Sequence, residues 1–167
     1  MSLLDIPIIS RIRRNHGLEH ASVTLLSSQK PSLALSGISF PSGFYILGDI
    51  DTETLRAAVF MALNRMQNGE RGLAVHPNCG TNFVTSGILA GFLAWLAMLG
   101  VKGRRDKVNR LPLVISLVTL AFIYSRPLGP LIQERITTSG EPAGLHIVDI
   151  YPIKLGNFTL HRVVTAD

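Results

Sequence analysis

Two histidines and a glutamate near the N-terminus form the pattern H-x-x-E-H. The pattern runs from His16 to His20, with Glu19 directly before the second histidine. On a helix, residues four positions apart share one face, so both imidazoles can reach one metal ion. Glu19 can then act as a general base on metal-bound water, or it can orient a ligand. The pattern is that of the inverted zincin motif and predicts a metal site.

A second group of candidate ligands follows about sixty residues later, in the stretch His76-Pro77-Asn78-Cys79-Gly80. The proline preforms a turn between His76 and Cys79, and the glycine tolerates a positive φ. Imidazole and thiolate are natural donors for zinc at a tetrahedral site. We therefore expect Zn²⁺ to be bound by His16, His20, His76 and Cys79.

The number of protein ligands decides the chemistry of such a site. Four ligands close the coordination sphere and make a structural site, whereas three ligands plus water, with Glu19 nearby, make a hydrolytic one. His76 could instead stabilise an oxyanion. In a further alternative, Cys79 is a nucleophile with a histidine base, but this leaves the helical histidine pair unexplained. His146 and His161 lie on expected strands without ligand spacing and are weaker candidates.

The segments around these motifs indicate a small α+β fold. Residues 1–15 form an arm whose arginines, Arg11, Arg13 and Arg14, are either solvated or in contact with anionic lipid. The expected elements are helices over 15–28 and from Asp51 or Thr52 to 67, short strands at 33–35, 44–47 and 73–75, and a C-terminal hairpin of 145–151 and 158–164 joined at Gly156-Asn157.

Residues 83–125 predict a hydrophobic helical hairpin. Its first arm, 83–101, has nineteen residues without a charge, which meets the roughly 17–25 residues that a membrane-spanning helix needs. A basic loop, 102–110, leads to a shorter second arm over 111–125, and Arg126-Pro127 is expected to end that helix. The positive-inside rule favours a cytoplasmic loop. The orientation stays open, because a shallowly inserted hairpin that does not cross is the alternative.

Composition narrows the class of partner. The formal net charge is +5, yet charged residues make up only 16% of the chain. The basic residues cluster beside apolar runs and lack interleaved aromatic side chains, which argues against nucleic acid and favours membrane lipid. Gly87 and Gly91 give 83–101 a G-x-x-x-G spacing that lets another membrane helix approach closely. The single cysteine excludes an internal disulfide.

In the two motif stretches the sequence resembles the YqhQ-like family of bacterial membrane proteins, described as predicted metal-dependent enzymes. The matching residues are His16-Gly17-Leu18-Glu19-His20 and His76-Pro77-Asn78-Cys79-Gly80-Thr81-Asn82. Ala21 stands where that family usually has a basic residue, and the chain is shorter, as in a compact branch. The resemblance implies metal binding and membrane association, and supplies no substrate.

Together these patterns predict an α+β metal-binding domain over 1–82, the hydrophobic hairpin over 83–125, and a C-terminal segment over 126–167 with its own β-hairpin. The expected location is a bacterial membrane. Two functional hypotheses stay open. One is a zinc-dependent hydrolase or peptidase with Glu19 as general base. The other is a non-catalytic, zinc-stapled scaffold or accessory subunit that docks onto a membrane complex through 83–101.

Overall fold

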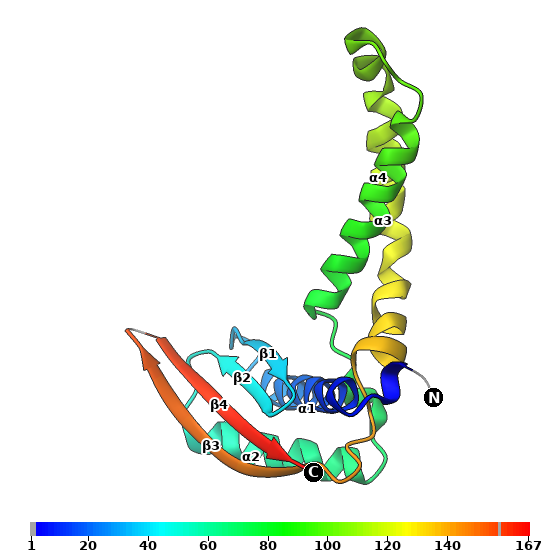
Figure 1. The fold of residues 1–167 in the computed structure, drawn as a ribbon. Helices are drawn as coiled ribbons and strands as arrows, with labels where there is room; N and C mark the ends of the chain where they lie inside the picture. Colours follow the sequence, from blue (N-terminus) through cyan, green and yellow to red (C-terminus); the bar gives the residue numbers. More distant parts are fainter. Residues whose placement is uncertain (1–2, 157) are drawn as a thin grey trace. The chain divides into compact units, whose positions relative to one another are not determined.

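The computed structural model describes residues 3–156 and 158–167. It divides the chain into two compact units (Figure 1). The first unit contains Met1–His76 together with Gln133–Asp167, and the second contains Pro77–Ile132. The predicted mixed α+β class is confirmed by four α-helices and a four-stranded antiparallel sheet among the described residues.

The sheet of the first unit combines two strands from before the helical hairpin with two strands from after it. Its strands are β1 (Ser36–Phe40), β2 (Gly43–Leu47), β3 (His146–Leu155) and β4 (Phe158–Ala166), in the order β1-β2-β4-β3. The predicted C-terminal hairpin is present, but it does not stand alone. Strand β4 pairs with β2, with Phe44 opposite Val163. Residues 133–167 therefore belong to the same unit as 1–76, and of the predicted Gly156-Asn157 turn, Asn157 lies outside the described residues.

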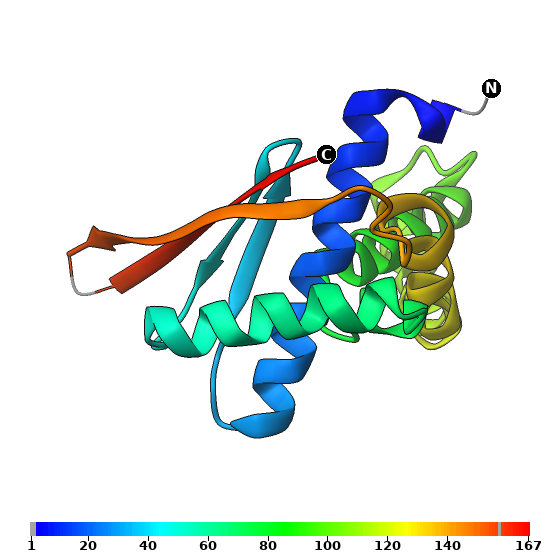
Figure 2. The ribbon, with the colours of Figure 1, turned by 90° about the horizontal axis from the view of Figure 1, so that it is seen from below.

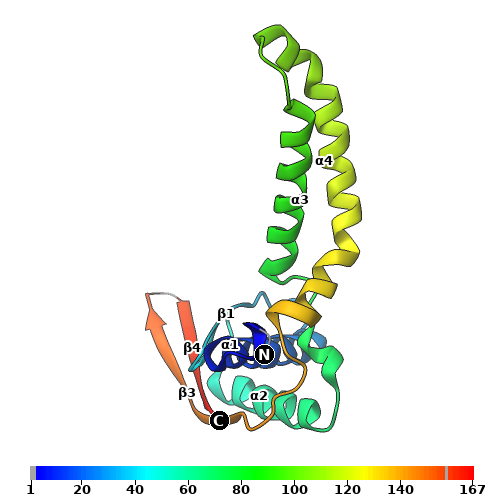
Figure 3. The same ribbon diagram turned by 45° about the vertical axis from the view of Figure 1, so that its right-hand side comes forward.

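Two helices cover the inner face of this sheet. Helix α1 (Pro7–Gln29) packs against β1 and β2, and helix α2 (Thr52–Gln67) packs against α1 and β3. Figure 3 shows both helices on one side of β3 and β4. The core is formed by inward-facing strand residues and the apolar faces of both helices, among them Leu18, Leu26, Phe44, Ile46, Leu55, Val59, Met66 and Val163.

Helix α1 begins eight residues earlier than predicted, so the N-terminal arm over 1–15 is largely helical. Pro7 stands in the first turn, where its missing N–H is not needed. Arg11 and Arg14 bind the two carboxylate oxygens of Asp167, at 2.7 and 2.5 Å. These two arginines, expected either in solvent or at lipid, therefore make intramolecular ion pairs that close the first unit.

Asn15 fixes α1 to both halves of the sheet. Its side chain is fully buried, and its amide donates to the carbonyls of Phe40 and Pro41 at 2.8 and 3.1 Å. Its carbonyl accepts a hydrogen bond from the Thr165 hydroxyl at 2.7 Å. Because every polar atom of this buried amide has a partner, the contact sets the position of the helix that carries His16 and His20.

Two predicted short strands are wrong. Residues 33–35 have no regular structure, and β1 begins after them at Ser36. Residues 71–74 form a 3₁₀ turn, η2 (Arg71–Ala74), instead of a strand over 73–75. The turn packs against α1 instead of pairing with another strand. Helix α2, by contrast, starts as predicted, with the Asp51 carboxylate accepting from the Thr54 amide at 2.8 Å.

His161 on β4 lies in the core beneath the start of α2. Its ring is 1% exposed, and its Nε2 is 3.1 Å from the Thr52 hydroxyl. Burial lowers the pKa of His161 below its ordinary value, and nearby Asp51 opposes that shift in part. The unfolded chain therefore binds the proton more readily than the folded one.

We expect this buried imidazole to make folding stability fall in mild acid. Because the folded pKa is depressed, its contribution is complete above the ordinary pKa of about 6.5 and is lost as pH falls toward the folded value. Chemical unfolding monitored by circular dichroism at pH 7.5 and about pH 5 measures the loss. A His161→Gln protein should lose less stability over this interval than wild type. Equal losses would show that His161 does not carry the effect.

The second unit is a pair of antiparallel helices, α3 (Gly80–Met98) and α4 (Arg104–Ile132), shown in Figure 1. Small residues line their contact: Ala90, Ala97 and Ala121 are buried, and the hydroxyls of Ser86 and Ser125 are 2.7 Å apart. A Cβ at Gly129 would lie 2.3 Å from the Asn82 side-chain oxygen. Close approach of this kind is typical of helices packed within membranes.

The predicted hairpin needs three corrections. The first helix starts and ends three residues earlier than 83–101. The segment 102–110 is helical from Arg104, so the second helix is much longer than 111–125. Pro127 and Pro130 lie inside α4 and do not end it, so the expected helix end at Arg126-Pro127 is wrong. Both α3 and α4 are long and apolar enough to span a membrane.

Candidate metal centre

His16 and His20 lie on one face of α1, as the four-residue spacing predicts. Their ring centroids are 4.3 Å apart, and a ring nitrogen of one lies within 4.8 Å of a ring nitrogen of the other. His20 is buried at 4% exposure, and His16 is partly exposed. The structure therefore brings the two predicted ligands of α1 together.

Backbone carbonyls hold both imidazole rings. His16 Nδ1 lies 2.9 Å from the Thr137 carbonyl oxygen, and His20 Nδ1 lies 2.8 Å from that of Ala74. A carbonyl only accepts, so each Nδ1 carries a proton, and the neutral form of such a ring has its lone pair on Nε2. Metal-binding histidines are generally oriented in this way, by donation from the second ring nitrogen to a carbonyl or carboxylate.

The two carbonyl partners are held close to α1 by Gly17. A Cβ at this position would lie 2.2 Å from the Ser139 carbonyl oxygen and 3.2 Å from the Ala74 side chain. The Ser139 amide also donates to the Arg13 carbonyl at 2.9 Å. The missing side chain thus allows η2 and the 137–139 segment to approach the helix. Helix propensity alone would give Gly17 only a destabilising role in α1.

His76 places a third imidazole beside the two of α1. Its ring centroid lies 5.8 Å from that of His20, at an interplanar angle of 46°. Its backbone amide donates to the side-chain oxygen of Gln133 at 2.9 Å, and Gln133 is fully buried. Gln133 starts the π-helical turn η3 (Gln133–Thr137), which also supplies the carbonyl of Thr137. Sequence reasoning missed Gln133 because it lies 57 positions from His76.

Cys79 belongs to the second unit, where it is the N-cap of α3. Its Sγ accepts a hydrogen bond from the Thr81 amide at 3.4 Å. The proline turn joins it to the first unit, because it follows His76 by three residues. An extended chain of that length separates two Cα atoms by at most about 11 Å. The covalent connection alone thus keeps the thiol in the neighbourhood of His76.

Glu19 is buried between α1 and β1. Its Oε2 accepts a hydrogen bond from the Ser39 hydroxyl at 2.6 Å, and the residue is 5% exposed. A Cβ at Gly37 would lie 2.3 Å from Glu19 Oε1, so the glycine leaves room for the carboxylate. Gly37 and Ser39 are two positions apart and face the same side of β1. No sequence pattern at Gly37 or Ser39 predicts that these residues contact Glu19.

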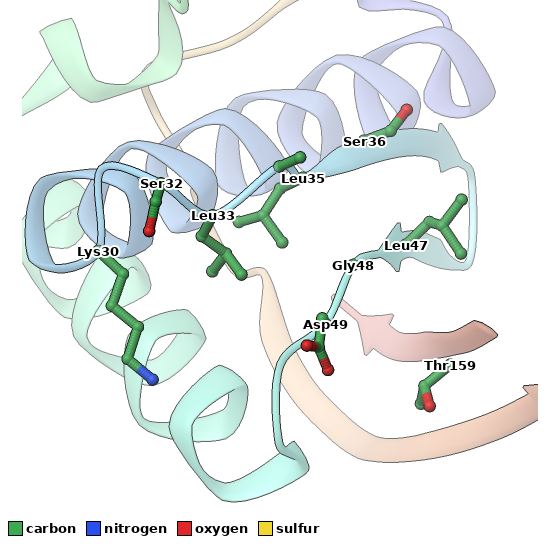
Figure 4. Close-up of a pocket in the computed structure, with 10 residues that line it drawn as sticks. Lys30, Ser32, Leu33, Leu35, Ser36, Leu47, Gly48, Asp49 and Thr159 are labelled. Carbon is green, nitrogen blue, oxygen red and sulfur yellow. The ribbon is translucent and has the colours of Figure 1, made fainter. Parts of the chain in front are cut away.

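The remaining histidines lie elsewhere in the described structure. His146 is exposed at the start of β3, with Nδ1 3.3 Å from the Gly144 carbonyl, and His161 is the core residue described above. A surface cavity of about 860 Å³ is also separate from the candidate ligands. Figure 4 shows it between the end of α1 and the loop after β2, with Lys30 and Asp49 among its lining residues.

Comparison with known proteins places the chain in a family. Residues 11–150 match the family described as "Domain of unknown function (DUF6391)". The chain belongs to this family. The DUF6391 match includes both motif stretches and both apolar helices. The resemblance to the YqhQ-like family stays a prediction from the two motifs.

One curated relative of this DUF6391 chain is an uncharacterised protein of Picosynechococcus sp. (strain ATCC 27264 / PCC 7002 / PR-6). The two are 36% identical over 142 residues, which cover 77% of this chain and 66% of the relative. The chain thus spans just under two thirds of the length of that relative. No solved structure matches the chain.

Proposed function

We propose that this protein is a membrane-associated zinc-binding protein whose metal centre is built on α1. The observation that supports this proposal best is the pair of backbone hydrogen bonds to His16 and His20. Both Nδ1 atoms donate to backbone carbonyls, which is the orientation in which Nε2 of a histidine coordinates a metal ion. Core packing alone does not explain why two histidines one helical turn apart have the same ring orientation, whereas joint binding of one ion does.

The proposed zinc ligands are His16, His20 and Cys79, and His76 is either a fourth ligand or the group that stabilises an oxyanion. The three histidines lie in one unit, with His76 beside His20, and Cys79 follows His76 by three residues. Nitrogen and thiolate donors in this combination favour Zn²⁺ over magnesium or calcium, which prefer oxygen. Zinc would link α1 to the segment that enters α3.

We further propose that the centre is hydrolytic, with Glu19 as the general base. Its carboxylate is kept inside the protein by Ser39 and lies on the same helix as two of the ligands. A metal with three protein ligands keeps a position for a water that a general base can activate. Peptides are the substrate class that the H-x-x-E-H pattern favours.

The competing function is a non-catalytic zinc-stapled scaffold or accessory subunit. Four protein ligands would close the metal site and leave Glu19 as a structural acceptor for Ser39. The observation that favours this alternative is the open face of α3, since a Cβ at Gly87 or Gly91 would meet nothing within 4 Å. A partner helix in a membrane complex could pack there.

In both proposed functions, the second unit attaches the protein to a membrane. Helices α3 and α4 have the length and apolar composition for a bilayer, and their largest aromatic and aliphatic side chains, such as Phe83 and Trp95, are exposed. We propose a bacterial membrane, cytoplasmic or internal, as the location. The segments on either side of the hairpin, 1–76 and 133–167, would lie on one side of it.

Replacement of Glu19 with Gln tests the catalytic role. The amide keeps the shape of the side chain and can still accept from Ser39, but it cannot take a proton from water. We expect unchanged zinc content by mass spectrometry and at least an about 100-fold loss of zinc-dependent hydrolysis of a fluorogenic casein substrate, because general-base catalysis typically contributes that much. Detergent-solubilised full-length protein is the sample for both measurements.

A Glu53→Gln protein is the matched control, since Glu53 lies exposed on α2 and makes only a 3.8 Å contact with Arg56. It should behave as wild type. Wild-type protein that holds zinc but cleaves nothing, or a Glu19→Gln protein of full activity, would refute the hydrolase and favour the scaffold. Purified wild type without a bound transition metal, and without affinity for added zinc, would overturn the whole proposal.

A further inference from the structure

Five positive side chains gather at the turn between α3 and α4. They are Lys102, Arg104, Arg105, Lys107 and Arg110, and all five are exposed. We call this group the basic tip. Lys102 lies in the turn after Met98, the last residue of α3, and the other four lie in the first two turns of α4. A third of the 16 lysines and arginines of the chain is thus concentrated in nine residues.

The basic tip has no acidic partner in the described part of the chain. Several arginines of the first unit, by contrast, are in ion pairs: Arg14 binds Asp167, Arg65 binds Glu70, and Arg71 binds Glu141. The described residues show no ion pair for any of the five tip side chains. The one acidic residue within the segment is Asp106, so a strong positive charge is left for an external partner.

The position of the basic tip on the hairpin indicates what that partner is. The Ser86–Ser125 contact and the approach of Asn82 to Gly129 mark the opposite end of the two helices. On α4, Arg110 and Arg126 enclose fifteen residues without a charge. Sixteen steps of 1.5 Å separate these two arginines by about 24 Å, close to the hydrocarbon thickness that long arginine side chains can bridge.

We propose that the basic tip binds the headgroups of anionic phospholipids. The inference rests on the membrane insertion of the hairpin proposed above, and it adds the lipid class and the residues that recognise it. Lysine and arginine attract anionic headgroups when they lie directly beside an apolar segment. Exposed apolar side chains next to the basic tip, Leu99 and Val108, would enter the outer part of the acyl chains.

Trp95 provides a built-in probe for this proposal. It is the only tryptophan of the chain, lies near the tip end of α3 and is 57% exposed. Full-length protein is reconstituted into phosphatidylcholine vesicles with a minority of phosphatidylglycerol. Bromine atoms are placed on the acyl chains of one lipid or the other. We expect brominated phosphatidylglycerol to quench Trp95 about two-fold more than its share of the lipid predicts, and the excess to disappear at about 0.5 M salt.

Two double variants with the same change in net charge complete the experiment. Arg104→Gln with Arg105→Gln should remove most of the excess quenching. Lys30→Gln with Lys154→Gln alters two exposed cations of the first unit and should leave it unchanged. Inorganic phosphate should compete no better than sodium chloride of equal ionic strength. Stronger competition would identify a free-phosphate site instead and overturn the lipid proposal.

Two other outcomes distinguish a failure of anionic-lipid selection from a failure of membrane insertion. Equal quenching by both brominated lipids in proportion to their amounts would refute selection of anionic lipid, while insertion of the hairpin would stand. Absence of quenching by either lipid would show that the hairpin does not enter the bilayer. That result would overturn the lipid proposal together with the membrane association on which it rests, and would leave the zinc centre unaffected.

Discussion

A His20→Gln protein is expected to bind zinc at least about 100-fold more weakly than wild type. Loss of a group that only orients a ligand lowers metal affinity by up to about 100-fold, and loss of the ligand itself should lower it at least as much. The glutamine amide can donate to the Ala74 carbonyl, as His20 Nδ1 does at 2.8 Å. The Ala74 carbonyl therefore keeps a donor, and the substitution removes only the Nε2 lone pair. Titration of the apoprotein with zinc against a chromophoric chelator measures the affinity.

The matched control is His146→Gln, because His146 is exposed at the start of β3 and its Nδ1 lies 3.3 Å from the nearby Gly144 carbonyl. Zinc affinity should be unchanged in this protein. His16→Gln should resemble His20→Gln, because Thr137 holds its ring in the same manner. Wild-type affinity in both α1 variants, with native circular dichroism spectra, would show that the paired imidazoles do not hold the metal.

Gly17→Ala is expected to destabilise the first unit by about 2–4 kcal/mol, as other substitutions that force atoms into a packed interior do. The added Cβ would lie 2.2 Å from the Ser139 carbonyl oxygen, which belongs to the backbone and cannot rotate away. Helix propensity alone would predict the opposite sign, a gain of about 1 kcal/mol. Urea unfolding followed by far-ultraviolet circular dichroism decides between them.

Gly72→Ala is the appropriate comparison in the same unit. A Cβ at Gly72 would meet nothing within 4 Å, so this substitution should change the unfolding midpoint little. The Gly17 variant should also bind zinc more weakly, because displacement of the 137–139 segment moves the Thr137 carbonyl away from His16. A Gly17→Ala protein as stable as wild type would mean that the close approach of that segment is not needed.

Local signals explain which elements were predictable. Helix α2 carries its own N-cap, Asp51, and a regular apolar spacing from Leu55 to Met66, so its start and its buried face could be predicted. The first half of α1 offered no such signal. Its arginines bind Asp167, more than 150 positions away, and a short-range pattern cannot reveal that contact. The same limit hid the pairing of β4 with β2.

In the candidate site, too, some residues could be predicted from local sequence patterns and others could not. The possible ligands could be found because histidine and cysteine are uncommon and their spacing has a geometric meaning. The groups that orient them could not, since two are backbone carbonyls, at Ala74 and Thr137, and any residue type can supply a carbonyl. Ser39 and Gln133 are ordinary polar residues whose roles depend on tertiary contacts with Glu19 and His76.

The strand order β1-β2-β4-β3 has a consequence for biosynthesis. Strand β4 stands between β2 and β3, and Thr165 is the partner of the buried Asn15. On the ribosome the sheet cannot close until residue 166 has been made, long after α3 and α4 have emerged. At about 5–20 residues per second, the helix that carries His16 and His20 waits several seconds for its final neighbours. The apolar hairpin is therefore complete before the first unit, whose two segments flank it in the sequence, can fold.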